Sequence, residues 1–280
     1  MRLIKSPSLI NKELSKYRIK GQPIGFVPTM GSLHEGHLTL IRRALKENRV
    51  VVVSVFVNPK QFAPGEDFRK YPRTVKRDLK LCRGEGVDFV FLPKDDDIYP
   101  GGFSTYVNVE GLDGFLCAKS RPGHFRGVTT IVAMLLNIIA PDVLYLGQKD
   151  AQQAVILKRM IEDLHIPVKV KVMPVVRSKD GLALSSRNAY LSERERKDAL
   201  VLSQALKLAE FLIENGASDA KRIILKMRQL IEKKRSAKID YIEIADPSTL
   251  KPLKKVAGSF LIALAVWIGK TRLIDNLLRK

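Results

Sequence analysis

The feature that most constrains the fold is a series of short apolar runs that alternate with helical patterns along the first two thirds of the chain. Ile24–Thr29 (IGFVPT) and Val50–Val57 (VVVVSVFV) are almost free of polar residues, which is typical of strands buried on both faces of a parallel sheet. The other predicted strands and the predicted helices are Asp88–Pro93, Asp142–Gly147 and Val168–Val176, then Gly36–Asn48, Thr74–Glu85, Gly127–Ile139 and Ala151–Leu164. This alternation predicts an α/β fold with a doubly wound parallel sheet.

The pattern changes near residue 180, and the remainder predicts a smaller α+β domain. Ser192 and Glu195 have the spacing of a capping box at the start of a helix, and Asn215-Gly216 is a stop signal for it. The predicted elements are the helices Ser192–Asn215 and Ser218–Lys234, then the strands Lys238–Ala245, Ser259–Trp267 and Thr271–Asp275. We therefore expect a Rossmann-like domain over residues 1–180 and a smaller domain over residues 181–280.

Composition narrows the classes of function. An apolar share of 45% excludes a wholly disordered chain, whereas the formal net charge of +20 suggests an anionic partner. Nucleic acid, a membrane surface and a phosphorylated small molecule are the candidates. Aromatic residues make up only 7% and there is no RNP-type motif, which argues against an RNA-binding module.

The sequence also predicts the cellular compartment of the protein. The longest apolar stretch, Val256–Gly269, is shorter than the roughly 20 residues of a membrane span, and we expect a buried strand there. The first residues lack the apolar core of a secretory signal, and the two cysteines, Cys82 and Cys117, match no metal spacing. We therefore expect a cytoplasmic protein with no membrane partner.

The turn after the first predicted strand is the best candidate for a phosphate site. Pro28-Thr29-Met30-Gly31 ends this strand, and the chain from Ser32 to His37 opens a helix. A helix N-terminus offers unpaired N–H groups and a positive dipole end, which favour phosphate. His34 and His37 are three residues apart, so they share one face and can donate hydrogen bonds to phosphate oxygens. A pair of capping or core histidines is the alternative.

His34-Glu35-Gly36-His37 resembles the HxGH signature of the nucleotidylyltransferase superfamily, whose members direct attack onto the α-phosphate of a nucleotide such as ATP. Further motifs follow in one order: Pro28–His37, Asn58–Phe62, Tyr71–Thr74, Gly123–Val128, Gly147–Asp150 and Ser185–Asn188. Together they resemble the pantothenate synthetase (pantoate–β-alanine ligase) family over essentially the whole chain. The resemblance implies a Rossmann-like domain of the nucleotidylyltransferase type and a ligase that joins pantoate to β-alanine. The reaction would pass through pantoyl adenylate and release pyrophosphate and then AMP.

The resemblance also implies roles for single residues. His37 is the implied proton donor, and His34 and Lys149 are the other implied catalytic residues. Gln61 and Gln153 are the implied pantoate contacts, although Gln152 offers the same chemistry and the residues alone do not decide between neighbours. The implied ATP contacts are Met30, Gly31, Ser32, Leu33, His34, Glu35, Gly36, His37, Gly147, Gln148, Lys149, Asp150, Val176, Leu184, Ser185, Ser186 and Arg187. Without the resemblance, Gly147–Asp150 fits a plain turn and Ser185–Arg187 fits a solvated loop.

Magnesium is expected to accompany ATP, and Asp78 aligns with an acidic stretch of the family. Where the family can carry adjacent acids this chain has Arg77 and Asp78, so a surface aspartate is the alternative. His124 and Arg126 either line the pantoate side or serve packing. The family implies a homodimer. Two other functions remain open, a nucleotidylyltransferase that stops at an adenylated product and a basic RNA-binding protein, although we expect no nucleic-acid partner.

Overall fold

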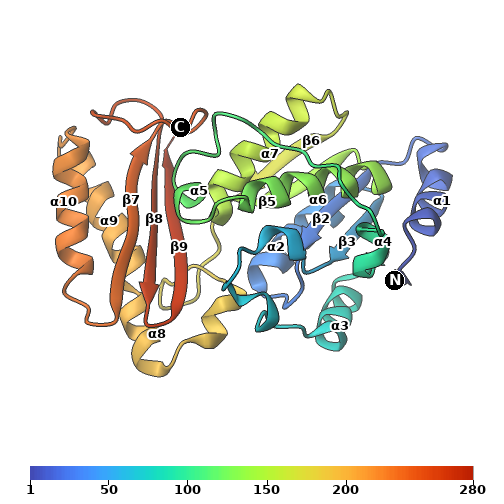
Figure 1. Ribbon diagram of the computed structural model, residues 1–280, viewed down its shortest axis with the longest axis horizontal. Helices are drawn as coiled ribbons and strands as arrows, with labels where there is room; N and C mark the ends of the chain where they lie inside the picture. The colour runs from blue at the N-terminus through green and yellow to red at the C-terminus, as the bar shows by residue number, and fades with distance from the viewer. Residues whose placement is uncertain (280) are drawn as a thin grey trace. The chain divides into compact units, whose positions relative to one another are not determined.

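Figure 1 shows the computed structural model, which describes residues 1–279 and contains two compact units. The first unit consists of Met1–Glu110, Pro122–Gly147 and Ile156–Pro174. The second consists of the chain from Val175 onward together with two earlier segments, Gly111–Arg121 and Gln148–Val155. The predicted boundary at residue 180 separates two independently folding domains. Compact units need not fold independently, so this boundary stays a prediction.

The first unit is built on a six-stranded parallel sheet in the order β1-β4-β3-β2-β5-β6. The strands are β1 (Arg2–Ile4), β2 (Ile24–Thr29), β3 (Val50–Val55), β4 (Phe89–Phe91), β5 (Val143–Gly147) and β6 (Lys169–Met173). The chain runs from β2 outward to β4 and then returns to place β5 on the other side of β2. Ligands of such sheets bind outside the carboxyl ends of the strands at the reversal, which here lies at β2 and β5.

Helices cover both faces of this sheet, so the predicted doubly wound α/β fold is confirmed. They are α1 (Pro7–Arg18), α2 (Glu35–Glu47), α3 (Val75–Glu85), α4 (Asp95–Ile98), α6 (His124–Ile139) and the part of α7 (Ala151–Asp163) from Ile156 on, with the short 3-10 helices η1 (Pro59–Gln61) and η2 (Asp67–Arg69). Val51 and Val53 of β3 pack in one cluster with Ile41 of α2. Val50 and Val52 point to the opposite face and are equally buried, which explains the unbroken apolar run.

Some boundaries differ from the predicted ones. Strand β6 ends at Met173 instead of Val176, because Pro174 follows and has no N–H to continue the ladder. Elements β1 and α1 are absent from the predicted set. Strand β1 has only three residues and pairs with β4 alone, so it is too short to show a periodic pattern.

The second unit is built on a three-stranded antiparallel sheet in the order β7-β8-β9. Its elements are α5 (Cys117–Ser120), η3 (Gln148–Asp150), η4 (Ser186–Tyr190), α8 (Glu193–Ala199), α9 (Val201–Glu214), α10 (Ala220–Ile231), β7 (Ala237–Ala245), β8 (Phe260–Ile268) and β9 (Thr271–Arg279). Alternate residues of β8, among them Ile262, Leu264 and Val266, form one core with residues of α9 and α10. The predicted α+β architecture is confirmed.

The predicted helix Ser192–Asn215 is two helices, α8 and α9, which join at Leu200. The capping box at its start is confirmed, because the N–H of Glu195 donates to the Ser192 hydroxyl and the N–H of Ser192 donates to the Glu195 carboxylate. The apolar stretch Val256–Gly269 contains β8, as predicted. Over residues 1–279, no helix has the length and apolar character that crossing a membrane requires.

Candidate active site

The loop between β2 and α2 turns at two consecutive residues with left-handed backbone. Gly31 has a φ of +78° and Ser32 a φ of +49°, and the latter is uncommon for a residue with a side chain. The hydroxyl of Thr29 accepts a hydrogen bond from the N–H of Gly31 (3.1 Å) and donates one to the carbonyl of Ser54 on β3 (2.7 Å). This support for the turn lets His34 take the N-cap position of α2.

The two histidines of the turn lie side by side, as their spacing predicts. Their ring centroids are 4.1 Å apart, and the backbone N–H of His34 donates to Nδ1 of His37 over 3.2 Å. A ring nitrogen that accepts a hydrogen bond carries no proton, so the neutral imidazole of His37 has its proton on Nε2. The backbone of the turn therefore prepares His37 as an Nε2–H donor.

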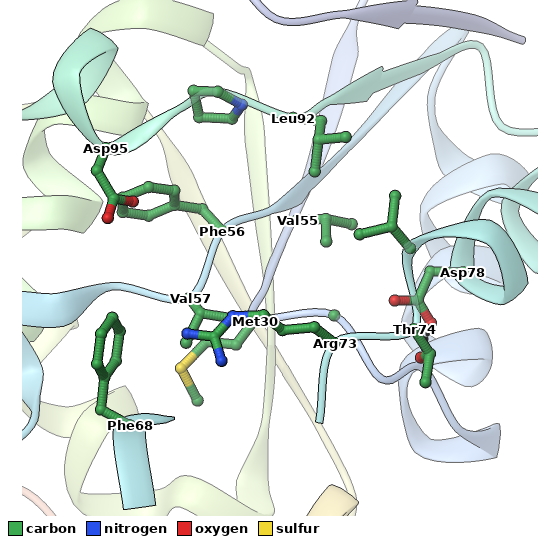
Figure 2. Close-up of a pocket in the computed structure, with 13 residues that line it drawn as sticks. Met30, Val55, Phe56, Val57, Phe68, Arg73, Thr74, Asp78, Leu92 and Asp95 are labelled. Carbon is green, nitrogen blue, oxygen red and sulfur yellow. Dashed lines mark hydrogen bonds between the residues drawn. The ribbon is translucent and has the colours of Figure 1, made fainter. Parts of the chain in front are cut away.

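Asp78 of α3 lies against the same loop. Its carboxylate accepts hydrogen bonds from the N–H groups of Ser32 and Leu33, both over 2.9 Å, and from the hydroxyl of Thr74 over 3.1 Å. Figure 2 shows Asp78 and Thr74 together at one side of an open cavity that Met30 also lines. Both carboxylate oxygens of Asp78, the candidate magnesium ligand, thus accept hydrogen bonds from groups of the protein itself.

Gln61, the predicted pantoate contact after β3, is held from several directions. Its side-chain Oε1 accepts from Nδ2 of Asn58 over 3.1 Å, and its Nε2 lies 3.1 Å from the sulfur of Met30. The ring of His124 holds its backbone, with Nδ1 lying 2.7 Å from the Gln61 carbonyl. Since a carbonyl only accepts, this nitrogen of His124 carries the proton. Gln61 is therefore fixed beside the histidine loop through Met30.

Asn58 is the member of this group whose role the sequence alone does not indicate. It is 1% exposed, its Nδ2 also donates to the carbonyl of Gly127 (3.0 Å), and its Oδ1 accepts from the hydroxyl of Tyr99 (2.7 Å). Burial raises the pKa of Tyr99, which keeps the phenol protonated as a donor. An asparagine directly after a predicted buried strand was the available signal, but two of its partners, Gly127 and Tyr99, lie far away along the chain.

Helix α6 approaches η1 so closely that only glycine fits at the contact. A Cβ on Gly127 would lie 2.3 Å from the carbonyl oxygen of Lys60 and 2.7 Å from Cα of Gln61. The motif Gly123–Val128 therefore serves packing at this point, by letting α6 support the backbone of Gln61. Arg126 of the same motif stacks on Tyr106, with its guanidinium carbon 4.5 Å from the ring centroid.

In the second unit, the turn Gln148–Asp150 is held by strand β9. Asn276 donates from its Nδ2 to the carbonyls of Gln148 and Lys149, both over 2.9 Å, and its Oδ1 accepts from Nε2 of Gln148 over 3.1 Å. Asn276 is 4% exposed and was not predicted as part of the site. It fixes the backbone from which the side chain of Lys149 extends.

The structure separates the neighbouring glutamines of α7. Gln152 is buried, its Oε1 accepts from the N–H of Cys117 (2.9 Å), and its Nε2 donates to the carbonyl of Phe115 (2.8 Å). These bonds tie the segment Gly111–Arg121 to the first turn of α7. Gln153 is half-buried, so it is the better candidate for a ligand contact, in agreement with the resemblance.

The predicted ATP residues near the start of the second unit lie on one hairpin-like loop. The N–H of Leu184 donates to the carbonyl of Val176 over 3.0 Å, and the Ser185 hydroxyl accepts from the N–H of Arg187 over 3.3 Å. Arg177 closes the base of this loop through two hydrogen bonds to the buried carboxylate of Asp275, of 2.6 and 2.9 Å. The backbone contact of Leu184 with Val176 orders the loop that leads into Ser185–Arg187.

The structure thus gathers the predicted residues into two groups, one in each unit. The first contains Met30–His37, Gln61, Asp78 and, at the end of β5, Gly147. The second contains Gln148–Asp150, Gln153, Val176 and Leu184–Arg187. Among residues 1–279, no group of three or more His, Cys, Asp and Glu side chains is arranged to hold a metal ion. With Asp78 engaged by backbone amides, the residues present do not form a magnesium site of their own.

Comparison with known proteins decides the family. A family model described as pantoate-beta-alanine ligase matches residues 2–278. This chain belongs to the pantoate–β-alanine ligase family. A pantothenate synthetase of Moorella thermoacetica is 52% identical over 276 residues, covering 99% of this chain and 98% of that protein. One of Acetivibrio thermocellus is 50% identical over 278 residues, covering 99% of each.

Solved structures of family members agree in fold. The pantothenate synthetase of Thermus thermophilus is 42% identical, with a TM-score of 0.94 and 99% of each chain covered. A pantoate-β-alanine ligase of Francisella tularensis, described as a complex with beta-gamma ATP and β-alanine, is 37% identical. Its TM-score is 0.83, with 99% of this chain and 97% of that chain covered. The resemblance found in the sequence and the assignment to an enzyme family are confirmed.

Proposed function

We propose that this protein is an AMP-forming ligase that joins pantoate to β-alanine through a pantoyl-adenylate intermediate. The observation that carries the proposal is the contact of the Gln61 amide with Met30. An amide can bind both a hydroxyl and a carboxylate oxygen, and this one lies beside the loop whose histidines would meet a nucleotide phosphate. In the first step, the carboxylate of pantoate must reach the α-phosphate of ATP. The contact of Gln61 with Met30 supports the proposal because it joins the proposed pantoate contact to the proposed phosphate-binding loop.

In the first half-reaction, a carboxylate oxygen of pantoate attacks the α-phosphorus of ATP, and the bond from this phosphorus to pyrophosphate breaks. The carboxylate is ionised at neutral pH, so the attack needs no base. His37 donates from Nε2 to a phosphate oxygen as negative charge builds up, and His34 assists from the same helix turn. Lys149 and Arg187 contribute positive charge, and Ser185 and Ser186 contribute hydroxyl donors.

In the second half-reaction, the amine of β-alanine attacks the acyl carbon of the adenylate. A carbon–nitrogen bond forms, the bond from the acyl carbon to the oxygen of AMP breaks, and the nitrogen gives up a proton. Gln61 and Gln153 are each a proposed contact of the pantoyl group. Catalysis by this set consists mainly of orientation and charge stabilisation.

The proposal includes magnesium, which would arrive on the phosphates of ATP and keep mostly phosphate and water oxygens as ligands. We assign no reaction step to it. A homodimer in the cytoplasm is the setting that the family resemblance supports, and size-exclusion chromatography with light scattering would test the dimer. The remaining predicted ATP contacts, including the backbone atoms of Val176 and Leu184, belong to the same proposal.

The proposal is tested by following pyrophosphate and AMP separately. With enzyme, ATP, magnesium and pantoate, we expect about one equivalent of pyrophosphate per active site and little AMP. Addition of β-alanine should start continuous release of AMP that matches the pantothenate formed. An enzyme that stops at an adenylated product would release pyrophosphate without this dependence on β-alanine. Lack of any pantoate-dependent pyrophosphate would contradict the proposal.

A further inference from the structure

A buried carboxylate occupies a backbone site that would otherwise suit a phosphate. Asp78 is 1% exposed, its Oδ2 accepts from the N–H of Ser32 and its Oδ1 from the N–H of Leu33. Successive N–H groups that a left-handed residue turns to one side form a concave anion-binding nest. Here the left-handed residues are Gly31 and Ser32, and the anion is supplied by the protein.

The fit of the carboxylate into this turn is tight. A Cβ on Gly31 would stand 3.0 Å from Oδ2 of Asp78 and 3.0 Å from a methyl carbon of Val55. The hydroxyl of Thr74, the N-cap residue of α3, donates to Oδ1 on the other side. Asp78 therefore links the start of α3 to the loop that begins α2, and Figure 2 shows it turned towards Thr74.

We propose that Asp78 is a positioning residue that holds the turn from Gly31 to Leu33, and with it the first turn of α2, and that it is not a ligand of magnesium. Its kinetic consequences rest on the proposed function. A displaced turn moves His34, whose N–H fixes the ring of His37. An orientation error of about 1 Å in such a group can cost on the order of 100-fold in rate.

The hydrogen bonds of the carboxylate argue against the metal. Three donors already point at its two oxygens, two of them backbone N–H groups at 2.9 Å. A magnesium ion demands a near-octahedral shell and retains several waters, whereas the side chain of Asp78 is only 1% exposed to water. The positive ends of the N–H dipoles would also face the cation. The backbone amides of Ser32 and Leu33 consequently act as hydrogen-bond donors to Asp78.

The kinetic test compares Asp78→Asn with Asp95→Asn. The first substitution keeps the size of the side chain but turns an NH₂ group towards one backbone N–H, so we expect kcat for adenylate formation to fall about 10- to 100-fold. The magnesium concentration for half-maximal rate should stay within about twofold of the wild type. Asp95 lines the same cavity but is exposed, and its variant should keep the wild-type kcat.

Two kinetic results would overturn the proposal. One is a normal kcat in Asp78→Asn. The other is a variant whose rate recovers at high magnesium with a raised half-saturating concentration, because that is the behaviour of a lost metal ligand. If Asp78→Asn does not fold, Thr74→Val removes one hydrogen bond from the carboxylate, and a severalfold lower kcat with unchanged magnesium dependence is expected.

A spectroscopic test separates this inference from the proposed function. In the ligand-free wild type, the amide protons of Ser32 and Leu33 should resonate downfield and exchange slowly, because they bond to a charged oxygen. Asp78→Asn or Thr74→Val should shift both amide signals and the ring nitrogens of His37, whereas Asp95→Asn should leave them in place. If these signals do not move, the positioning role is refuted, whatever reaction the enzyme catalyses.

Discussion

At the scale of single residues, the side chains proposed to take part in the reaction are oriented by polar neighbours, most of them buried. The backbone of His34 sets the tautomer of His37, and Asn58 and His124 hold the side chain and the backbone of Gln61. In the second unit, Asn276 does the same for the backbone of Lys149. Asn58, His124 and Asn276 are buried, and a polar group left unpaired at such a position would be costly.

His37 gives the most direct prediction at this scale. His37→Ala should lower kcat for adenylate formation by roughly 10²–10³, the cost of losing one donor to a developing negative charge. His37→Gln should retain more activity, because its amide N–H lies near the position of Nε2 in the imidazole. Rapid-quench measurement of pyrophosphate release checks both. His165→Asn, at an exposed histidine on the surface, is the control and should behave as the wild type.

A folded His37→Ala enzyme with normal pyrophosphate release would contradict the donor role.

The sequence could suggest His34, His37 and Gln61, because their residue types and spacing after strands carry a chemical meaning. It could not supply Asn58, Asp78 or Asn276 in their supporting roles, since these depend on partners from distant parts of the chain. It also left Gln152 and Gln153 equivalent until the hydrogen bonds of Gln152 to the segment Gly111–Arg121 were visible.

At the scale of elements, strands buried on both faces were the easiest to predict and short edge elements the hardest. Strand β3 contains five nearly consecutive valines, which predict a buried strand. Strand β1 has only three residues and pairs with a single neighbouring strand. The single predicted helix after Ser192 breaks at Leu200 although its apolar pattern continues. Nothing in the local sequence, such as proline or glycine, marks that break.

The contact of α6 with η1 predicts a large effect of one methyl group. Gly127→Ala would force its Cβ into the backbone of Lys60 and Gln61, so it should lower the free energy of unfolding by about 1–3 kcal/mol and raise KM for pantoate. Gly84→Ala is the matched control, because that helical position is open space and alanine should be neutral or stabilise by up to about 1 kcal/mol. Urea unfolding and steady-state kinetics measure both, and equal stability of the two variants would contradict the close approach.

Glu47 at the end of α2 joins that helix to β5 and β6. We expect its contribution to the stability of the protein to depend on pH. Hydrogen bonds from Lys171 (2.8 Å), and then from Tyr145 (2.7 Å) and Arg43, lower the pKa of Glu47 from 4.5 to about 2. A pKa lowered by folding stabilises the protein above pH 4.5, and this contribution disappears as the pH falls towards 2. Glu47→Gln should therefore lower Tm at pH 7, with the difference shrinking below about pH 4.5.

The control for this measurement is Glu162→Gln on the exposed side of α7. Its Tm should follow the wild type at every pH. Differential scanning calorimetry between pH 7 and pH 3 gives the comparison. A Tm difference for Glu47→Gln that is independent of pH would show that the ionised carboxylate is not what stabilises these three elements.

At the scale of the whole molecule, the net charge of +20 exceeds what the proposed site uses. Lys149 and Arg187 account for a small part of it, and ATP, pantoate and pyrophosphate are all anions that a positive site would attract. Much of the remainder lies on exposed faces such as that of α10, where Arg222 and Lys226 are one helical turn apart. Like charges at this spacing repel each other by a few tenths of a kcal/mol.

This excess predicts that salt stabilises the protein, because screening weakens the net repulsion among the surplus cations more than it weakens the surface ion pairs, which contribute little individually. Raising sodium chloride from about 20 mM to about 500 mM, without nucleotide, should raise Tm by several degrees. Arg222→Glu places a carboxylate near the N-terminus of α10 and opposite Lys226, so it should raise Tm at low salt and lose most of this advantage at high salt. A Tm that falls with sodium chloride would mean that attraction within the ion pairs outweighs the repulsion, and that the surplus charge is not a source of instability.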